Sequence, residues 1–224
     1  AAGYMKSDGV GALSWDAVID LDKGGTGTSL TDPNADRIMF WDDSATAVAF
    51  LTAGAGLSIV GTTMTGGFTL GTEQASTSGT SITFTGIPAG TKMILVQFDE
   101  VSTSGTSVLE VRLGDAGGIE ATGYAGGSGY SDISGTAGIN STTGFPVEAS
   151  SGATTTRSGQ FVLTLEDSTN FTWTCTAIIS NSNFTGASVT AGRKALSAEL
   201  DRVSITTVNG TDTFDAGAIN IMYM

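Results

Sequence analysis

The sequence predicts an all-β protein in two parts, a thin N-terminal fibre segment over 1–71 followed by a C-terminal jelly-roll-like β-sandwich over 72–224. From residue 72 onward, apolar and polar residues alternate with the period of two that marks half-buried strands. Helical spacing of apolar residues is sustained nowhere. Only 14% of the residues are charged, and threonine, which suits the solvent face of strands, is abundant.

The segment 1–71 has small apolar clusters that glycine, aspartate or asparagine separates from one another. Two of the three tryptophans, Trp15 and Trp41, lie in this segment, although a solvated linker does not tolerate exposed indoles. We therefore expect several copies of the chain to wrap together as a homotrimer that buries these side chains. The residues expected at the trimer contacts are Trp15, Phe40, Trp41, Phe50 and Leu57.

The segment 72–224 carries the regular alternation. The predicted strands lie near 80–86, 91–99, 106–113, 118–124, 158–166, 171–180, 193–200, 201–208 and 215–223. Residues 93–98 are apolar on both faces, which is typical of a central strand that is covered on two sides. Many short strands separated by turn residues favour a sandwich.

Residues 114–157 interrupt this pattern with glycine and serine, and we predict a long loop region there, of the kind that often carries function. The rings of Tyr124 and Tyr130 stand among glycines, close to side chains that can bind sugar hydroxyls. Alternatively, either tyrosine packs across a subunit interface or back on the sheet. The candidate ligand-binding residues in this region are Tyr124, Tyr130, Asp132, Asn140 and Phe145.

The composition argues against catalysis, and we expect no enzyme, no metal and no cofactor. The chain has no histidine, which removes the commonest general base, the usual zinc ligand and the Ser-His-Asp arrangement. Paired carboxylates stay open as an alternative, because glycosidases need only two. The candidate pairs, each at the end of a predicted strand where acids cap turns, are Asp99 with Glu100, Glu166 with Asp167, and Asp212 with Asp215.

Nine basic residues against 22 acidic ones give a formal charge of −13, which argues against nucleic acid and anionic lipid as partners. The acidic side chains of the first segment either keep exposed turns solvated or, alternatively, bind cations between chains. No run of 18 apolar residues exists, so membrane insertion is not expected. Cys175 is the only cysteine and is expected to be a buried thiol, so no intrachain disulfide forms.

Five segments resemble the tail fibres of tailed bacteriophages. Three are similar to shaft segments, namely DKGGTGTSL at 22–30, DRIMFWDDS at 36–44 and GAGLSI at 54–59, and two, at 113–124 and 200–217, are similar to the distal domain of such fibres. The resemblance implies a homotrimeric virion protein outside the cell. Its distal domain would touch the host surface, and other tail proteins would bind a part that precedes residue 1.

The resemblance implies no catalytic residue. Because receptor contacts vary between phages, it places the expected receptor-binding residues in 125–152 and in the loops around 181–192 rather than in the matching segments. The predicted function is therefore non-catalytic adhesion to a host cell, with three heads combining weak contacts into avidity. A glycan receptor is favoured over a protein because the surface is rich in hydroxyls and low in charge. The alternatives are a purely structural virion fibre component and a polysaccharide depolymerase.

Overall fold

The computed structural model describes residues 4–7, 10, 13–16, 34, 37–52, 57–60, 62–132, 135–182 and 186–224. The chain divides into two compact units, residues 1–66 and residues 67–224. Across the described residues every regular element is a β-strand, and every strand pairing is antiparallel. The predicted all-β class is confirmed.

The described residues of the first unit form three two-stranded hairpins. They pair β1 (Tyr4–Ser7) with β2 (Leu13–Asp16), β3 (Ile38–Asp42) with β4 (Ala47–Leu51), and β5 (Leu57–Val60) with β6 (Thr63–Gly66). The β3–β4 turn is held by Asp42, whose Oδ1 accepts hydrogen bonds from the Ser44 amide at 3.0 Å and the Ser44 hydroxyl at 2.6 Å. Aspartate favours turns because its side chain can bond to nearby backbone in this way.

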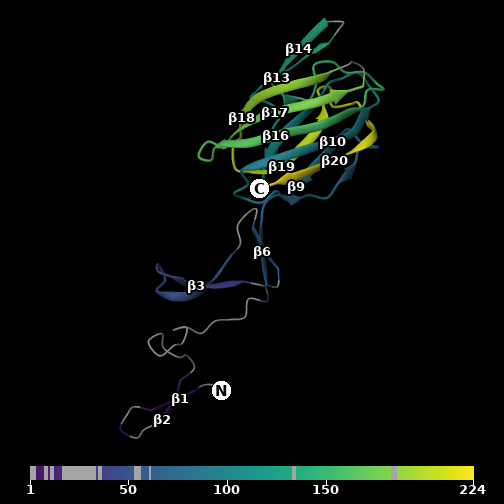
Figure 1. Cartoon of the computed structure of the whole chain (residues 1–224). Helices are drawn as coiled ribbons and strands as arrows, with labels where there is room; N and C mark the ends of the chain where they lie inside the picture. The colour runs from purple at the N-terminus through teal and green to yellow at the C-terminus, as the bar shows by residue number, and fades with distance from the viewer. Residues whose placement is uncertain are drawn as a thin grey trace. The chain divides into compact units, whose positions relative to one another are not determined.

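The second unit contains two sheets, and the larger has nine strands in the order β14-β13-β18-β17-β16-β10-β20-β7, with β8 also paired to β20. Figure 1 shows β13, β18, β17, β16, β10 and β20 side by side. Its strands are β7 (Thr69–Leu70), β8 (Gln74–Ala75), β10 (Met93–Thr103), β13 (Tyr124–Asp132), β14 (Gly135–Ser141), β16 (Arg157–Asp167), β17 (Thr172–Asn181), β18 (Ala187–Ala195) and β20 (Phe214–Tyr223). Because β7 belongs to this sheet, the division between the units falls a few residues before the predicted boundary at 71/72.

The smaller sheet has five strands in the order β12-β11-β19-β9, with β15 paired to β11. Its strands are β9 (Ser81–Thr85), β11 (Leu109–Asp115), β12 (Gly118–Ile119), β15 (Phe145–Pro146) and β19 (Leu200–Thr207). Buried side chains from both sheets belong to one hydrophobic cluster, which makes the second unit a sandwich-like arrangement with a single core.

The alternation in β17 shows how the core is filled. Trp173, Cys175, Ala177 and Ile179 point inward and are buried, whereas the residues between them are more exposed. Phe161 on the neighbouring strand β16 is fully buried. Burial of apolar side chains on one face of each sheet is the main stabilising contribution to such a unit.

The predicted loop over 114–157 is wrong in part, because β12, β13, β14 and β15 lie within it. The alternation is hidden there because several strand positions are glycines. The prediction of a strand over 193–200 is also misplaced, since β18 covers Ala187–Ala195. In β18 the usual polarity is inverted: Ser188 and Thr190 are buried, whereas Val189 is exposed. The central position of β10, between β16 and β20, follows the prediction, but the outward residues of β10 are only half-buried.

The segment between β15 and β16 has no strand but is fixed by a buried ion pair. The Arg157 guanidinium donates from Nε to Glu148 Oε1 at 2.6 Å, and both side chains are fully buried. The Asn181 side-chain amide donates to Glu148 Oε2 at 2.6 Å, and Arg157 Nη1 donates to the Thr155 carbonyl at 2.9 Å. These bonds satisfy the charges that burial would otherwise leave unpaired.

Candidate binding surface

The outer face of the nine-stranded sheet, which points away from the core, places residues of distant strands in straight rows. The strand registers align two such rows. The first row is Asn140, Gly127, Ala191, Thr176, Val162, Leu95, Met222 and Leu70, and the second is Gly138, Gly129, Val189, Ile178, Gln160, Gln97 and Asn220. Within both rows no side chain is charged, although the whole chain has a net charge of −13.

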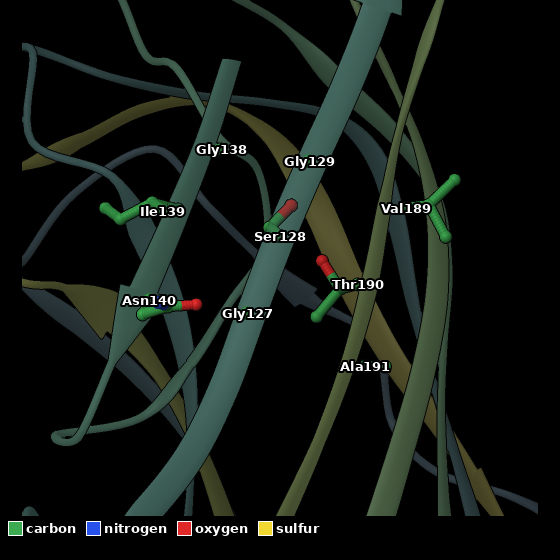
Figure 2. A pocket seen from close by; sticks show the side chains of 9 residues that line it. All are labelled: Gly127, Ser128, Gly129, Gly138, Ile139, Asn140, Val189, Thr190 and Ala191. Carbon is green, nitrogen blue, oxygen red and sulfur yellow. The ribbon is translucent and has the colours of Figure 1, made fainter. Parts of the chain in front are cut away.

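Two hollows lie on this outer face. The first, shown in Figure 2, has a volume of about 390 Å³ and is lined by residues 127–129 of β13, 138–140 of β14 and 189–191 of β18. The second has a volume of about 560 Å³ and is lined by residues of β16 and β17 together with the same three residues of β18. The hollows therefore adjoin along β18, and neither is lined by a charged residue.

Three outward glycines form the floor of the first hollow. A Cβ built on Gly129 would meet only the Ala137 carbonyl oxygen at 3.5 Å, and one on Gly138 only the Ser128 carbonyl oxygen at 3.6 Å, which are ordinary contacts. A Cβ on Gly127 would lie 3.0 Å from Oδ1 of Asn140, whose side chain points from β14 toward β13 in Figure 2. Neither Gly129 nor Gly138 has the positive φ that would demand glycine. The fold of this chain therefore does not require these two glycines.

The inward glycines of the same strands are different. A Cβ on Gly192 would lie 2.7 Å from Phe145 Cδ1, and a Cβ on Gly126 would lie 3.0 Å from Pro146 Cδ. Gly192 is therefore needed for core packing, and Gly126 leaves little room for a side chain. A strand glycine that packing does not explain often marks a place where a ligand or another backbone approaches closely.

Apolar and amide groups border the glycine floor. Val189 and Ile178 are cross-strand partners on β18 and β17, and they are 59% and 66% exposed. Asn140 stands on the opposite side of the first hollow, and the exposed Gln160 borders the second. Such a surface offers C–H groups and neutral hydrogen-bonding groups, but it offers no fixed charge to attract an ion.

The predicted receptor residues divide between this surface and the core. Asn140 lines the first hollow, and Tyr130 is half-buried in β13. Asp132 ends β13, and its side chain lies outside the described residues. Asn140 lies on the outer face of the sheet. It lines the same hollow as residues 189–191 of β18, which belong to the second expected contact region at 181–192.

Tyr124 and Phe145 are buried, so they do not form a surface in this chain. The Tyr124 hydroxyl accepts a hydrogen bond from the Leu113 amide at 2.7 Å and donates to the Glu120 carbonyl at 3.0 Å. Burial raises the pKa of this phenol. The Phe145 ring meets the Tyr124 ring edge-to-face at 4.9 Å. Tyr124 therefore packs back on the sheet, as the alternative interpretation expected. The Phe145 ring against which it packs lies close to Gly126 of β13 and Gly192 of β18, where a side chain would crowd the ring.

The residues predicted at trimer contacts differ in exposure. Phe40 and Trp41 are exposed, whereas Phe50 and Leu57 are half-buried. The side chain of Trp15 lies outside the described residues.

Of the paired carboxylates, Asp167 ends β16 and Asp212 lies just before β20, whereas Asp99, Glu100, Glu166 and Asp215 lie within strands. Asp167 Oδ2 accepts a hydrogen bond from the Asn170 side-chain amide at 2.6 Å, and Asp212 Oδ1 accepts one from the Asn209 side-chain amide at 2.7 Å. These bonds hold the pKa of each carboxyl below its ordinary value. A glycosidase acid needs a raised pKa instead, so these two carboxyls do not fit that role.

The remaining chemistry of the described residues is sparse. They contain no group of three or more histidine, cysteine, aspartate or glutamate side chains that could hold a metal ion. Cys175 is buried, and burial raises the pKa of its thiol to about 12. Within the same part of the chain, no helix is long and apolar enough to cross a membrane.

Sequence reasoning missed the contribution of β16 and β17 to this surface, namely Gln160, Thr176 and Ile178, and it expected loops rather than a strand at the part of 181–192 that contains Val189 and Ala191. A signal was present in 187–191, where apolar and small polar residues alternate. The pattern indicates a strand, but it does not reveal which set faces the core.

Comparisons of the chain with protein-family models, with curated proteins and with solved structures found no match.

Proposed function

We propose that the chain is a receptor-binding tail fibre protein of a tailed bacteriophage and acts by non-catalytic adhesion. In this proposal residues 1–71 form a thin trimeric shaft, and residues 72–224 form a jelly-roll-like head that contacts the host cell. The protein belongs to the virion, outside the cell, and is joined to other tail proteins. The resemblance of five sequence segments to such fibres supports this assignment.

The observation that carries the adhesive role is the uncharged, glycine-floored hollow on β14, β13 and β18. Its lining residues lie within 125–152 and within 181–192, the regions where receptor contacts are expected. A hollow with bare peptide groups lets a ligand approach the backbone, and the neighbouring amide and hydroxyl groups can bond to it. None of the described residues that line the two hollows is acidic, so the lining itself supplies no carboxylate that could cleave what binds there.

The ligand class that fits this hollow best is a neutral glycan. Sugar hydroxyls can bond to the Asn140 side-chain amide, and the C–H faces of a sugar can pack on Val189. An anionic glycan would find no cation in the lining. A single weak site gains strength when three copies bind one cell surface, because the second and third contacts occur at high effective concentration.

Glycan-array binding of the full chain tests the proposal, with Gly129→Leu as the variant that fills the hollow. We expect the full chain to retain a neutral surface polysaccharide and Gly129→Leu to lose roughly tenfold or more in affinity. Gln97→Ala is the matched control, because Gln97 lies in the same row as Gly129 but four strands away.

Three outcomes would overturn parts of this proposal. Retention of a purified outer-membrane protein with no polysaccharide bound would replace the glycan with a protein receptor. Halos on a bacterial lawn that disappear on alanine substitution of the paired acids would indicate a depolymerase. Soluble protein that binds no host cell, together with normal phage adsorption after deletion of 125–152, would indicate a purely structural fibre.

A further inference from the structure

The indole of Trp173 is buried in the core of the second unit, but its N–H group has no partner within the described part of the chain. Trp173 is 2% exposed, and no described residue accepts a hydrogen bond from its Nε1. An indole can only donate, and the ring fixes the direction of its N–H, so it cannot turn toward another group as a hydroxyl does. Because buried donors in folded proteins are nearly always paired, Nε1 indicates a partner that is not part of the protein.

Trp173 lines a small cavity beside the core. The cavity has a volume of about 30 Å³ and lies between strand β17, the β16–β17 turn, the turn before β10 and the segment before β19. Leu165, Phe171 and Leu200 supply the rest of its apolar lining. A water molecule needs roughly 10–15 Å³ of such space, so the cavity has room for water but not for a sugar or a cofactor.

The polar lining of the cavity provides the further partners that a buried water requires. Glu199 Oε1 accepts a hydrogen bond from the Gly90 amide at 2.7 Å, and a carboxylate has lone pairs for more than one donor. The Thr91 hydroxyl donates to the Pro88 carbonyl at 2.7 Å, so its oxygen can still accept. A buried water typically makes about three hydrogen bonds. One bond from Nε1 and two to these side chains would reach that number.

We propose that this cavity is a hydration site, in which a buried water accepts a hydrogen bond from Trp173 Nε1 and donates to Glu199 and Thr91. The water links β17 to the turn before β10 and to the segment before β19, which are far apart in the chain. The site belongs to the core of the second unit and not to the outer face of the large sheet. The inference therefore does not depend on the proposed function.

The chemistry of the lining selects water over other occupants of this size. Lys92 and Glu199 bring one charge of each sign to the lining, so the two charges cancel. A metal ion would meet the indole N–H, which is a donor and cannot coordinate a cation. An apolar gas atom would leave the N–H unpaired. Water can accept the bond from Nε1 and donate two of its own.

Transfer of NMR magnetisation between water and the tryptophan indoles of the full chain tests this inference. The signal of Trp173 is the one that disappears in Trp173→Phe, and if that variant does not fold, Trp15→Phe and Trp41→Phe identify it by elimination. We expect a cross-peak between the Trp173 N–H and water. The same N–H should exchange with deuterated solvent at least roughly tenfold more slowly than in denaturant. The slow exchange shows that the cross-peak comes from a bound water rather than from proton exchange.

Variants of the lining distinguish the bound water from protein hydroxyls and identify its acceptor. In the double variant Thr91→Val with Ser168→Ala, which removes both lining hydroxyls that could relay magnetisation, the cross-peak should persist. Glu199→Gln keeps an acceptor for the Gly90 amide but removes the charge that strengthens the bond from water, so the cross-peak should fall several-fold. Glu166→Gln is the matched control, because Glu166 is exposed and does not line the cavity.

Three outcomes would overturn the hydration site. A protected Trp173 N–H without a cross-peak would mean that the cavity is dry. Loss of the cross-peak in the double hydroxyl variant would mean that the hydroxyls had relayed it, and equal effects of Glu199→Gln and Glu166→Gln would remove Glu199 as the acceptor. None of these measurements depends on receptor binding or on the number of copies, so they leave the adhesive function to its own test.

Discussion

Strands β17 and β3 come from the two units of the chain and show opposite relations between sequence and burial. In β17 the inward residues are buried and the outward ones more exposed, and Trp173 is only 2% exposed. In β3 the indole of Trp41 is nearly half exposed, as are its neighbours on both faces. The second unit therefore buries the inward face of β17, although Ile178 on the outward face is 66% exposed, whereas neither face of β3 is buried. Exposed apolar surface that is contiguous usually marks a contact with another molecule.

The largest expected effect comes from the core. Phe161→Ala should lower the free energy of unfolding of the second unit by about 3–5 kcal/mol, because the ring is fully buried and its removal leaves a cavity. Urea denaturation measures this, and the loss should not depend on protein concentration. Phe40→Ala should lower stability only at concentrations where copies associate. Equal, concentration-independent losses from both variants would break the comparison between the units.

A smaller effect separates the two faces of the large sheet. Gly192→Ala should cost about 1–3 kcal/mol, because its new Cβ would lie 2.7 Å from the Phe145 ring. Gly129→Ala should leave stability unchanged or raise it by about 0.5–1 kcal/mol, since alanine restricts the unfolded chain more than glycine does. Thermal unfolding of the two variants checks this pair. A large loss from Gly129→Ala would mean that the fold itself needs the outer glycines.

Acid should weaken both units through their turns. The pKa of Asp212 in the second unit is lowered, first by the Asn209 side-chain amide, and that of Asp42 in the first unit is lowered, first by the Ser44 hydroxyl. A carboxyl whose pKa is lower in the folded chain stabilises it above the unfolded pKa, near pH 4, and this stabilisation is lost as the pH falls through the folded value.

Urea unfolding at a series of pH values should therefore show a constant free energy from about pH 7 to 5 and a decline below about pH 4. In the Asp212→Asn variant the decline should be shallower. Unchanged stability down to pH 2 would contradict the assigned turn bonds.

The smallest expected effect concerns the reactivity of the Cys175 thiol. Burial raises the pKa of the Cys175 thiol to about 12, so the native second unit should not react with a thiol reagent at pH 8. In denaturant the thiol should react at once. Reaction of the native chain at the denatured rate would show that the core opens readily and would remove the contrast with the first unit.

The sequence predicts the strands of the second unit where apolar side chains face the core. Leu109, Val111 and Leu113 alternate with polar residues in the sequence, and in the structure they are buried in strand β11. The same logic failed over 124–141, because Gly127, Gly129 and Gly138 occupy outward positions and give no polar signal. It also misplaced β18, in which small hydroxyl residues are buried and Val189 is outside.

The sequence predicted only part of the candidate site. Asn140 was predicted, but its neighbours from β16, β17 and β18 come together through strand pairings that local patterns do not encode. The exclusion of Tyr124 depends on the Phe145 ring and on a hydrogen bond to the distant Leu113 amide. Such contacts between residues far apart in the chain decide burial, and composition does not report them.

Strand β20 lies beside β10 within the large sheet and also pairs with β7 and β8. Residues 214–223 must therefore leave the ribosome before this sheet can be completed, however early the strands from β7 onward are synthesised. Until then the edge of β10 that β20 will occupy has unpaired backbone groups, which can recruit a strand from another nascent chain. Synthesis on crowded polysomes should thus favour misassembly, and a chaperone that shields this edge should raise the yield of folded protein.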